Sequence, residues 1–240
     1  MSVVAIDLAR PIDLSHISDP VREEYRLEVD TRQAEEWPEF AHYPRLPDAW
    51  YVLSQITMST HVGTHVEMPL HHHRDGTDVA TMPATVLAGE GVAIDISPFR
   101  ANNTKIELAS LKAVCGDRIR PGDMAFFFTG NDEFYYTPRR HERPWFTTEC
   151  IDWLVDDAKI KLMGVDTSGH EVRNPDGTPT AGQPNHERLL GAGVPLIEYL
   201  TNLEELLTCR FVAFVLPPRI AGAEAFPVRV VAFELTGDAL

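Results

Sequence analysis

Short apolar runs, each bounded by turn-forming residues, dominate the hydrophobic pattern of this chain. The runs are rich in Val, Ile and Phe and are flanked by Gly, Pro, Asp or Asn, which is typical of β-strands. The strands predicted from this pattern include Val3–Leu8, Ser54–Val66, Gly91–Ile96, Met124–Thr129, Lys161–Val165, Val194–Glu198, Phe211–Leu216 and Val228–Leu235.

Helical patterns are fewer and fall between some of the predicted strands. They cover Leu108–Val114, Thr147–Ala158, Glu187–Leu190 and Leu200–Leu207. Strands that outnumber helices in this way predict an α/β or α+β fold with a mixed sheet. The chain has no internal repeat and no linker long enough to separate two domains, so we predict that residues 1–240 form a single domain.

The segment Gly130–Trp145 departs from this pattern, because its aromatic, basic and proline residues follow no steady period. Two interpretations stay open. It is either a solvated connection or a lid over a pocket, since long irregular loops inside compact domains are often functional.

Composition and charge exclude several kinds of partner. Hydrophobic residues make up 44% and charged residues 24% of the 240 residues, which is ordinary for a soluble globular protein. The net charge of −15 repels phosphate backbones and anionic lipids, so we expect no nucleic-acid partner and no membrane partner. The start of the sequence lacks a signal-peptide pattern, and no apolar stretch is long enough to span a membrane.

The three cysteines, Cys115, Cys150 and Cys209, are scattered and show no CxxC spacing. This spacing argues against a disulfide framework and against a thiolate zinc site, and it fits a reducing, cytoplasmic location. We interpret all three as small buried hydrophobic residues.

The most informative segment is Ser59–Pro83, which reads STHVGTHVEMPLHHHRDGTDVATMP. Residues two apart in a strand share a face. One face would then carry His61, Gly63, His65, Glu67, Pro69 and His71, and the other would carry Val62, Thr64, Val66, Met68 and Leu70. We therefore expect a strand that runs into a turn, with an apolar face in the core and a row of imidazoles and a carboxylate opposite. β-branched residues, a glycine and a proline argue against a helix here.

These residue types are the usual ligands of a catalytic zinc or manganese ion. Three protein ligands leave room for a water molecule, whose pKa the metal lowers, and a further imidazole such as His71 can move protons. Gly63 removes a side chain from this face and would let a substrate or ion come close. His72 and His73 are interpreted as solvated residues without a specific role.

The sequence HVGTHVEMPLH, from His61 to His71, resembles the HxGTHxDxPxH signature of the metal-dependent cyclase family, which includes bacterial kynurenine formamidase and isatin hydrolase. The opening RPIDLSHIS, the segments FFFTGN and GVDTSG, and the stretch NHERLLGAGVPLIEYL are also similar to that family. The resemblance implies that His61, His65 and Glu67 are metal ligands and that His71 is the catalytic acid/base, with a ligand role in some metal states. It implies further that His186 and Glu198 bind a second metal ion or complete a single site.

The resemblance also implies a compact β/β/α fold of the swivelling type, one or two zinc or manganese ions, and a homodimer or homotetramer. This chain departs from the signature at Glu67, where the family usually has aspartate. The extra methylene extends the carboxylate by about 1.5 Å, which puts the two-metal arrangement and the substrate class in question.

Three functions are weighed. The leading one is hydrolysis of a C–N amide bond in a small aryl formamide or cyclic amide by metal-activated water, with Arg139, Arg140 and Arg143 as candidates to pair with a substrate carboxylate. The second is lactone or ester chemistry at the same site. The third is a non-catalytic protein that binds metal on the same scaffold.

Overall fold

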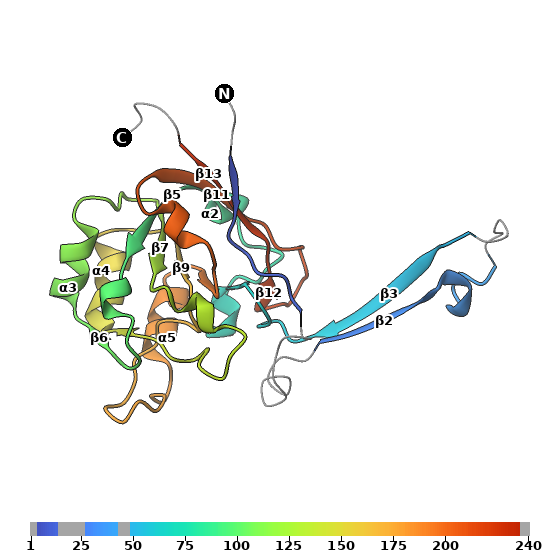
Figure 1. Cartoon of the computed structure of the whole chain (residues 1–240), viewed down its shortest axis with the longest axis horizontal. Helices are drawn as coiled ribbons and strands as arrows, with labels where there is room; N and C mark the ends of the chain where they lie inside the picture. The colour runs from blue at the N-terminus through green and yellow to red at the C-terminus, as the bar shows by residue number, and fades with distance from the viewer. Residues whose placement is uncertain (1–3, 14–26, 43–48, 236–240) are drawn as a thin grey trace.

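The computed structural model describes residues 4–13, 27–42 and 49–235, and a large mixed sheet forms its centre (Figure 1). The nine strands of this sheet follow the order β1-β13-β11-β5-β7-β9-β10-β4-β12. Four neighbouring strands run parallel: β5 (Ala88–Asp95), β7 (Met124–Phe128), β9 (Leu162–Val165) and β10 (Leu196–Glu198). The antiparallel members are β1 (Ala5–Asp7), β4 (His65–Glu67), β11 (Arg210–Val215), β12 (Ala225–Pro227) and β13 (Val230–Glu234).

Two apolar cores lie on the two faces of this curled sheet. On one face, Phe126, Phe211 and Val66 belong to a core that includes residues of both strands and loops. On the other face, α3 (Leu108–Cys115), α4 (Thr148–Asp156) and α5 (Pro184–Gly191) pack on Val92, Phe127 and Met163 and cover β5, β7, β9 and β10 (Figure 1). The predicted mixed α/β class is therefore confirmed.

The short elements complete the fold. A two-stranded parallel ladder joins β6 (Lys105–Ile106) to β8 (Trp145–Phe146), and a short helix, α2 (Ala84–Leu87), precedes β5. Single 3-10 turns are η2 (Ala34–Glu36), η3 (Pro69–His71), η4 (Ser97–Phe99), η5 (Asn131–Phe134) and η6 (Leu203–Leu206). The helices of the described residues lack the length and apolar character that a membrane span requires.

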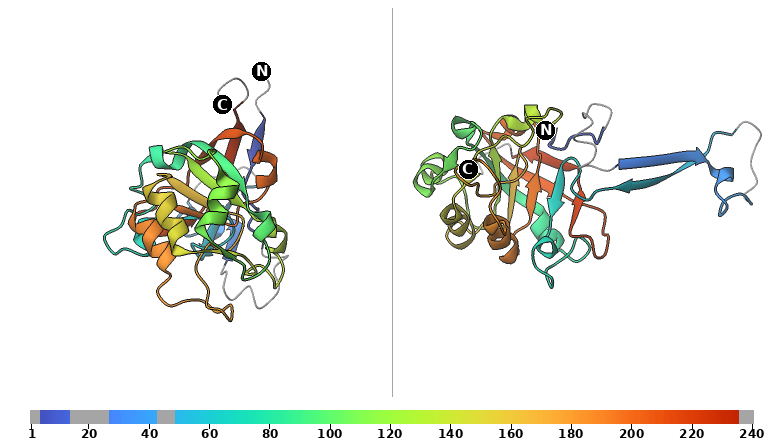
Figure 2. Two further views of the ribbon diagram at one scale, coloured as in Figure 1. Left: turned by 90° about the vertical axis from the view of Figure 1, so that its left-hand side faces the viewer. Right: turned by 90° about the horizontal axis from the view of Figure 1, so that it is seen from below.

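A β-hairpin of β2 (Leu27–Gln33) and β3 (Val52–Met58) projects far from the rest of the fold (Figures 1 and 2). The prediction of one continuous strand over Ser54–Val66 is therefore wrong. The chain leaves the hairpin at Met58, turns through residues 59–64 and enters the large sheet only at His65. Gly63 has φ +67°, a conformation that ends strand geometry, which explains the interruption.

Most other predicted elements are present, with ends shifted by a few residues. The helix expected over Leu200–Leu207 is wrong, since only a 3-10 turn forms there, η6. Asn202, with φ +56°, sits just before this turn. All three cysteines are free: Cys115 and Cys150 are buried, Cys209 is half-buried, and burial raises the pKa of the Cys115 thiol to about 12.

Candidate metal centre

The pairing of β4 with β10 brings together residues that are far apart in sequence. In this antiparallel pair Glu198 lies directly opposite His65, and Leu196 lies opposite Glu67. Residues opposite each other in an antiparallel pair share a face, and the neighbouring Val66 and Ile197 point into the core on the other face. His186 approaches the same place from the first turn of α5. The fold thus brings His186 and Glu198, from the second half of the chain, to the histidine-rich segment.

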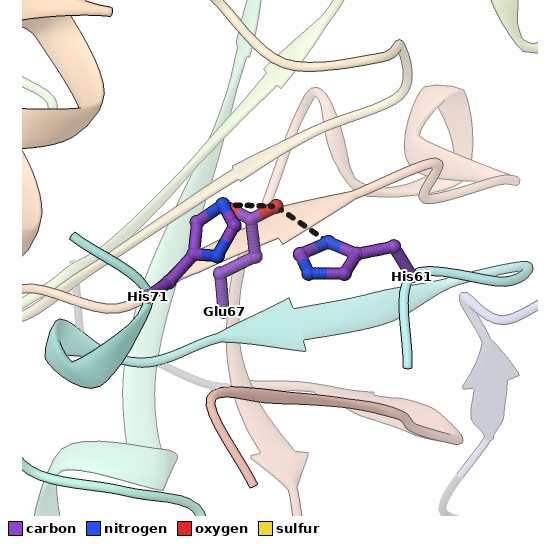
Figure 3. Close-up of side chains that lie close together, drawn as sticks. All are labelled: His61, Glu67 and His71. Carbon is purple, nitrogen blue, oxygen red and sulfur yellow. Dashed lines mark ion pairs between the residues drawn. The ribbon is translucent and has the colours of Figure 1, made fainter. Parts of the chain in front are cut away.

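His61 and His71 reach the centre from turns rather than from a strand. His61 precedes β4, and His71 lies in η3 directly after it. Figure 3 shows both imidazoles pointing toward the Glu67 carboxylate. The expected period-2 row therefore holds for His65 and Glu67, which lie in β4, but it is wrong for His61 and His71. All of these side chains nevertheless converge.

Glu67 lies at the middle of the cluster. Its Oε1 is 3.0 Å from His61 Nδ1, 3.5 Å from His65 Nε2 and 4.0 Å from His71 Nε2. Its Oε2 lies 3.7 Å from His186 Nε2, is buried and accepts no hydrogen bond within the described structure. A buried carboxylate oxygen without a donor, among four imidazoles, fits a site that a cation completes.

Among the described residues, two groups of side chains have the spacing that a metal ion needs, and both contain Glu67. The first is His61, Glu67 and His71, and the second is His65, Glu67 and Glu198, with the donor atoms of each group within 4.8 Å of one another. His186 Nε2 lies 3.6 Å from Glu198 Oε1, so it adjoins the second group. The longer Glu67 side chain therefore reaches both groups. The roles of these residues as ligands stay predictions.

Hydrogen bonds fix which nitrogen each histidine turns toward the centre. His65 Nδ1 donates to the carbonyl of Gly63 at 2.9 Å, and His186 Nδ1 donates to Glu171 Oε2 at 2.8 Å. In both rings Nε2 is left to face the carboxylates. This is the arrangement of metal-binding histidines, in which an outer acceptor sets the tautomer.

The carboxylate and the imidazoles of the cluster shift one another's pKa values. Burial opposes ionisation of Glu67, but hydrogen bonds from His61 and His65 hold the pKa of its carboxyl well below the ordinary value. Burial would lower the pKa of His61, whereas the hydrogen bond and charge of Glu67 raise it above its usual value. The pKa of His71 is lowered, by burial first and then by the neighbouring imidazoles. His71 therefore favours its neutral form, in which it can accept a proton.

Glu171 is a site residue that the sequence did not indicate. Its buried carboxylate accepts hydrogen bonds from His186 Nδ1 and from the backbone N–H groups of Asn185 and His186, at 2.8 to 3.2 Å. Burial opposes its ionisation, but these bonds lower the pKa of Glu171 to about 2. A lone glutamate after GVDTSGH carries no spacing signal, and only the approach of α5 reveals its role.

We expect Glu171→Gln to weaken metal binding by about 10- to 100-fold, because the amide no longer holds His186 with a charge-assisted bond. Competition titration of zinc against a chelator of known affinity measures this. Glu187→Gln is the matched control, since Glu187 lies on the same helix and its side chain is not part of the cluster. Equal affinities for Glu171→Gln and wild type would refute the orienting role.

A buried carboxylate also joins the two glycine-containing segments FFFTGN and GVDTSG. Asp166, at the end of β9, accepts hydrogen bonds from the backbone N–H groups of Thr129 and Gly130 at 2.9 and 2.8 Å and from Thr129 Oγ1 at 2.7 Å. Burial raises the pKa of Asp166 to about 7, although these three bonds oppose the shift. Asp166 therefore fixes the start of the segment after β7.

This raised pKa predicts a pH-dependent stability. The folded state holds the Asp166 proton more tightly than the unfolded state, whose pKa is near 3.8, so stability falls as the pH rises from about 4 to about 7 and is constant above. We expect Asp166→Asn to lose this contribution. Urea unfolding of both proteins at about pH 5 and about pH 8 measures it. The difference in the free energy of unfolding between wild type and Asp166→Asn should change with pH. A difference that is the same at both pH values would contradict the raised pKa of Asp166.

A cavity of about 610 Å³ opens onto this cluster of histidines and glutamates. Besides the cluster residues, its wall includes His141, Arg143, Ser168, Arg173, Gln183 and Tyr199. Two of these, His141 and Arg143, belong to Gly130–Trp145, whose residues Asn131, Arg140 and Arg143 are buried. The segment is therefore a packed wall of the cavity, and the interpretation as a solvated connection is wrong. Arg139, by contrast, is exposed and paired with Glu142.

Two glycines make the site possible by backbone conformation. Gly63 has φ +67°, and a Cβ there would lie 2.9 Å from Ile12 Cγ1, so the glycine serves the turn and not the approach of a substrate. Gly169, with φ +79°, lies against Glu198 so closely that a Cβ would collide with Oε1 of that carboxylate. The expectation for Gly63 is corrected accordingly.

Two further histidines lie outside the cluster. His72 Nε2 lies 3.0 Å from Gln183 Oε1, and its ring stacks on His186 with centroids 5.6 Å apart. His73 Nε2 donates to the carbonyl of Glu187 at 2.9 Å. Both rings are half-buried and contact the region of α5, and the interpretation that they have no specific role stays a prediction.

Comparison with known proteins places the chain in a family. The family described as "Putative cyclase" matches residues 6–172, and the chain belongs to it. A kynurenine formamidase of Polaromonas naphthalenivorans is 27% identical over 241 residues, which cover 95% of this chain and 94% of the relative. Cyclase-like protein 2 of Oryza sativa subsp. japonica is 29% identical over 190 residues, which cover 75% of this chain and 64% of that protein.

The fold has solved counterparts. Isatin hydrolase A from Labrenzia aggregata superposes with a TM-score of 0.77 at 22% identity, covering 98% of this chain and 94% of the other. A predicted metal-dependent hydrolase from Bacillus stearothermophilus superposes with a TM-score of 0.73 at 23% identity, covering 98% and 100%. The resemblance stated from the sequence is thereby confirmed for family and fold.

Proposed function

We propose that the protein is a metal-dependent hydrolase that cleaves a C–N amide bond in a small aryl formamide or cyclic amide. Relatives named kynurenine formamidase support the amide chemistry. One structural observation carries the proposal: the buried Glu67 carboxylate is shared by two groups of metal-type ligands at the floor of a cavity. An enzyme, rather than a storage site, explains why the ligands face an accessible cavity.

In this proposal His61, His65, Glu67, His186 and Glu198 hold one or two zinc or manganese ions. Imidazole and carboxylate ligands suit these ions. A bound divalent ion would activate water and polarise the substrate carbonyl. The chain's part is to hold Glu67 between the two groups and to keep His65 and His186 in the tautomers described above.

His71 is proposed as the acid/base. Its ring lies beside His61, with centroids 4.7 Å apart, and its Nε2 is 4.0 Å from Glu67 Oε1. A neutral imidazole at this position can accept a proton from the attacking water and later donate it to the leaving nitrogen. The same ring could instead serve as a ligand of the first group, a role that the sequence also implied.

Substrate assays separate the three functions. Zinc- or manganese-loaded protein is expected to hydrolyse formanilide-type amides. Turnover of lactones alone would favour the second function, lactone or ester chemistry. Tight metal binding without turnover of either class would leave the non-catalytic interpretation. We also keep the cytoplasm as the proposed location, since three free cysteines suit a reducing compartment.

The β2–β3 hairpin supports the proposed homo-oligomer. Its cross-strand pairs Leu27–Met58 and Val29–Ile56 place apolar side chains on one face, and the other face carries the pair Asp30–Gln55. Val29 and Ile56 are more than half exposed. A two-stranded hairpin is at best marginally stable alone in water, so an uncovered apolar face needs a partner surface.

We propose that this partner is a second copy of the chain. The helix-free outer face of β11 and β13 offers a matching apolar surface, where Phe214 pairs with Val231 and Val212 pairs with Phe233. The hairpin projects away from the rest of its own chain, which leaves it free to reach this surface of a second copy (Figure 2).

Ile56→Glu should therefore convert the oligomer to a monomer of 26.9 kDa in light scattering after size-exclusion chromatography. A charge placed in an apolar interface has a large desolvation cost. Gln55→Glu, on the opposite face of the same strand, is the matched control and should leave the assembly intact. A monomeric wild-type protein would contradict the proposal.

A further inference from the structure

One wall of the cavity carries a buried positive charge that the proposed mechanism does not use. Arg143 lines the cavity and is only 6% exposed. Its Nη1 donates to the carbonyls of Pro144 and Glu171 at 3.2 and 3.0 Å. Because the Glu171 carboxylate holds His186, the guanidinium is anchored to the residue that orients one of the candidate ligands.

The remaining nitrogens of Arg143 have no acceptor among the residues that the structure describes. Its Nε is buried without a hydrogen bond, and within the described structure neither Nε nor Nη2 meets an oxygen of the chain. The structure also shows no ion pair between Arg143 and a described carboxylate. Among the described residues, two neutral carbonyls are thus its only hydrogen-bond partners, and a buried guanidinium is normally paired with an anion.

A second arginine lies on the same wall. Arg173 donates from Nη1 to the carbonyl of Gly177 at 2.8 Å and from Nη2 to the carbonyl of His141 at 2.7 Å, and its buried Nε also lacks an acceptor. Burial, and next the positive charge of Arg173, lower the pKa of Arg143 to about 10. The charges of Glu198 and Glu171 oppose this shift but do not cancel it.

The nearby acids are already engaged. Glu171 binds His186, and Glu198 lies 3.8 Å from His65 Nε2 and 3.6 Å from His186 Nε2. Divalent ions in the cluster would add further positive charge beside this wall. The cavity thus has a cationic wall next to the reacting position, and within the described residues neither Arg143 nor Arg173 forms an ion pair with a carboxylate.

We propose that Arg143, backed by Arg173, forms an anion-binding subsite, and that the substrate is a small amide that carries a carboxylate near its scissile bond. This inference rests on the proposed function and names the substrate class for the same site. A guanidinium binds a carboxylate with charge-assisted hydrogen bonds, and the donors left free on Arg143 suit that ligand. The anchoring through Glu171 would set the carboxylate at a fixed separation from the metal ligands.

A different role for Arg143 predicts different behaviour. If the guanidinium stabilised only the charge that develops on the carbonyl oxygen, its loss would affect neutral and anionic compounds equally. If it binds a substrate carboxylate, its loss would weaken the binding of anionic ligands only. Paired probes of similar shape therefore distinguish the two roles.

The test measures binding of benzoate and of benzamide to zinc-loaded protein by calorimetry. Wild type is expected to prefer benzoate, and Arg143→Met should weaken benzoate binding by about tenfold or more while benzamide binding and zinc content stay unchanged. Arg139→Met is the matched control, because Arg139 is exposed, pairs with Glu142 and does not line the cavity. Arg143→Lys keeps the charge and should retain part of the preference for benzoate over benzamide. This variant tests the subsite even if Arg143→Met does not fold.

Equal binding of the two probes by wild type, no binding of benzoate, or equal weakening of both probes by Arg143→Met would overturn the subsite. The outcome is independent of catalysis. A benzoate preference that depends on Arg143, in a protein without amidase activity, would sustain the subsite and remove the proposed function. Hydrolysis of neutral formanilide and of 2-formamidobenzoate at equal efficiency would sustain the proposed function and remove the subsite.

Discussion

Glu67→Gln is expected to lose its bound metal and, with it, all measurable hydrolysis. Glu67 is the one residue present in both candidate ligand groups, and its two oxygens face different histidines. The amide keeps the shape of the side chain but removes the negative charge that offsets a divalent ion. Removing even an outer partner of a ligand reduces metal affinity by about 10- to 100-fold, so loss of a shared ligand should exceed that range.

Glu67→Asp is the informative control for this prediction. It restores the residue that the family signature usually carries and withdraws the carboxylate by about 1.5 Å. We expect this variant to retain metal, with a changed affinity or stoichiometry, which elemental analysis and a turnover assay measure side by side. Full metal content in Glu67→Gln would show that the cluster binds its ion without the shared carboxylate, contrary to the geometry.

His71→Ala is expected to lower kcat by about 10²- to 10⁴-fold while the protein keeps its metal. The reason is that His71 supplies an imidazole whose lowered pKa favours the neutral form beside Glu67, and the five candidate ligands stay in place. Initial rates with a formanilide substrate, measured beside the metal content, test this. The pH-rate profile should also lose the limb that reports the free base.

His73→Ala is the matched control for that variant, because His73 follows in the same histidine run but donates to the carbonyl of Glu187. It should leave kcat near that of wild type. If His71→Ala loses its metal, His71 is a ligand of the first group instead. If neither kcat nor metal content changes, His71 has no part in the reaction.

The sequence predicted those parts of the fold that depend on local pattern. Apolar runs located most strands of the large sheet, and the spacing of His61, His65, Glu67 and His71 located one half of the cluster. The distal residues His186 and Glu198 came from the family resemblance. The structure explains their position through the pairing of β10 with β4, which places Glu198 opposite His65.

What the sequence could not predict depends on contacts between distant segments. The strand Leu27–Gln33 alternates polar and charged residues with few apolar ones, because its hairpin has no core of its own. Glu171 gains its role only when α5 brings His186 to it, and Arg143 was one of three similar arginines until the fold buried it against the cavity. The break at Gly63 was hidden because β-branched residues continue on both sides of it.

The measurement that tests the central claim most directly is the metal content of the untagged protein, by elemental analysis, beside a His65→Ala, Glu67→Ala double variant. One or two equivalents of zinc or manganese per chain in wild type, lost in the double variant, are the predicted result. A wild-type protein that binds neither ion, even after incubation with both, would contradict the metal centre and the hydrolysis derived from it.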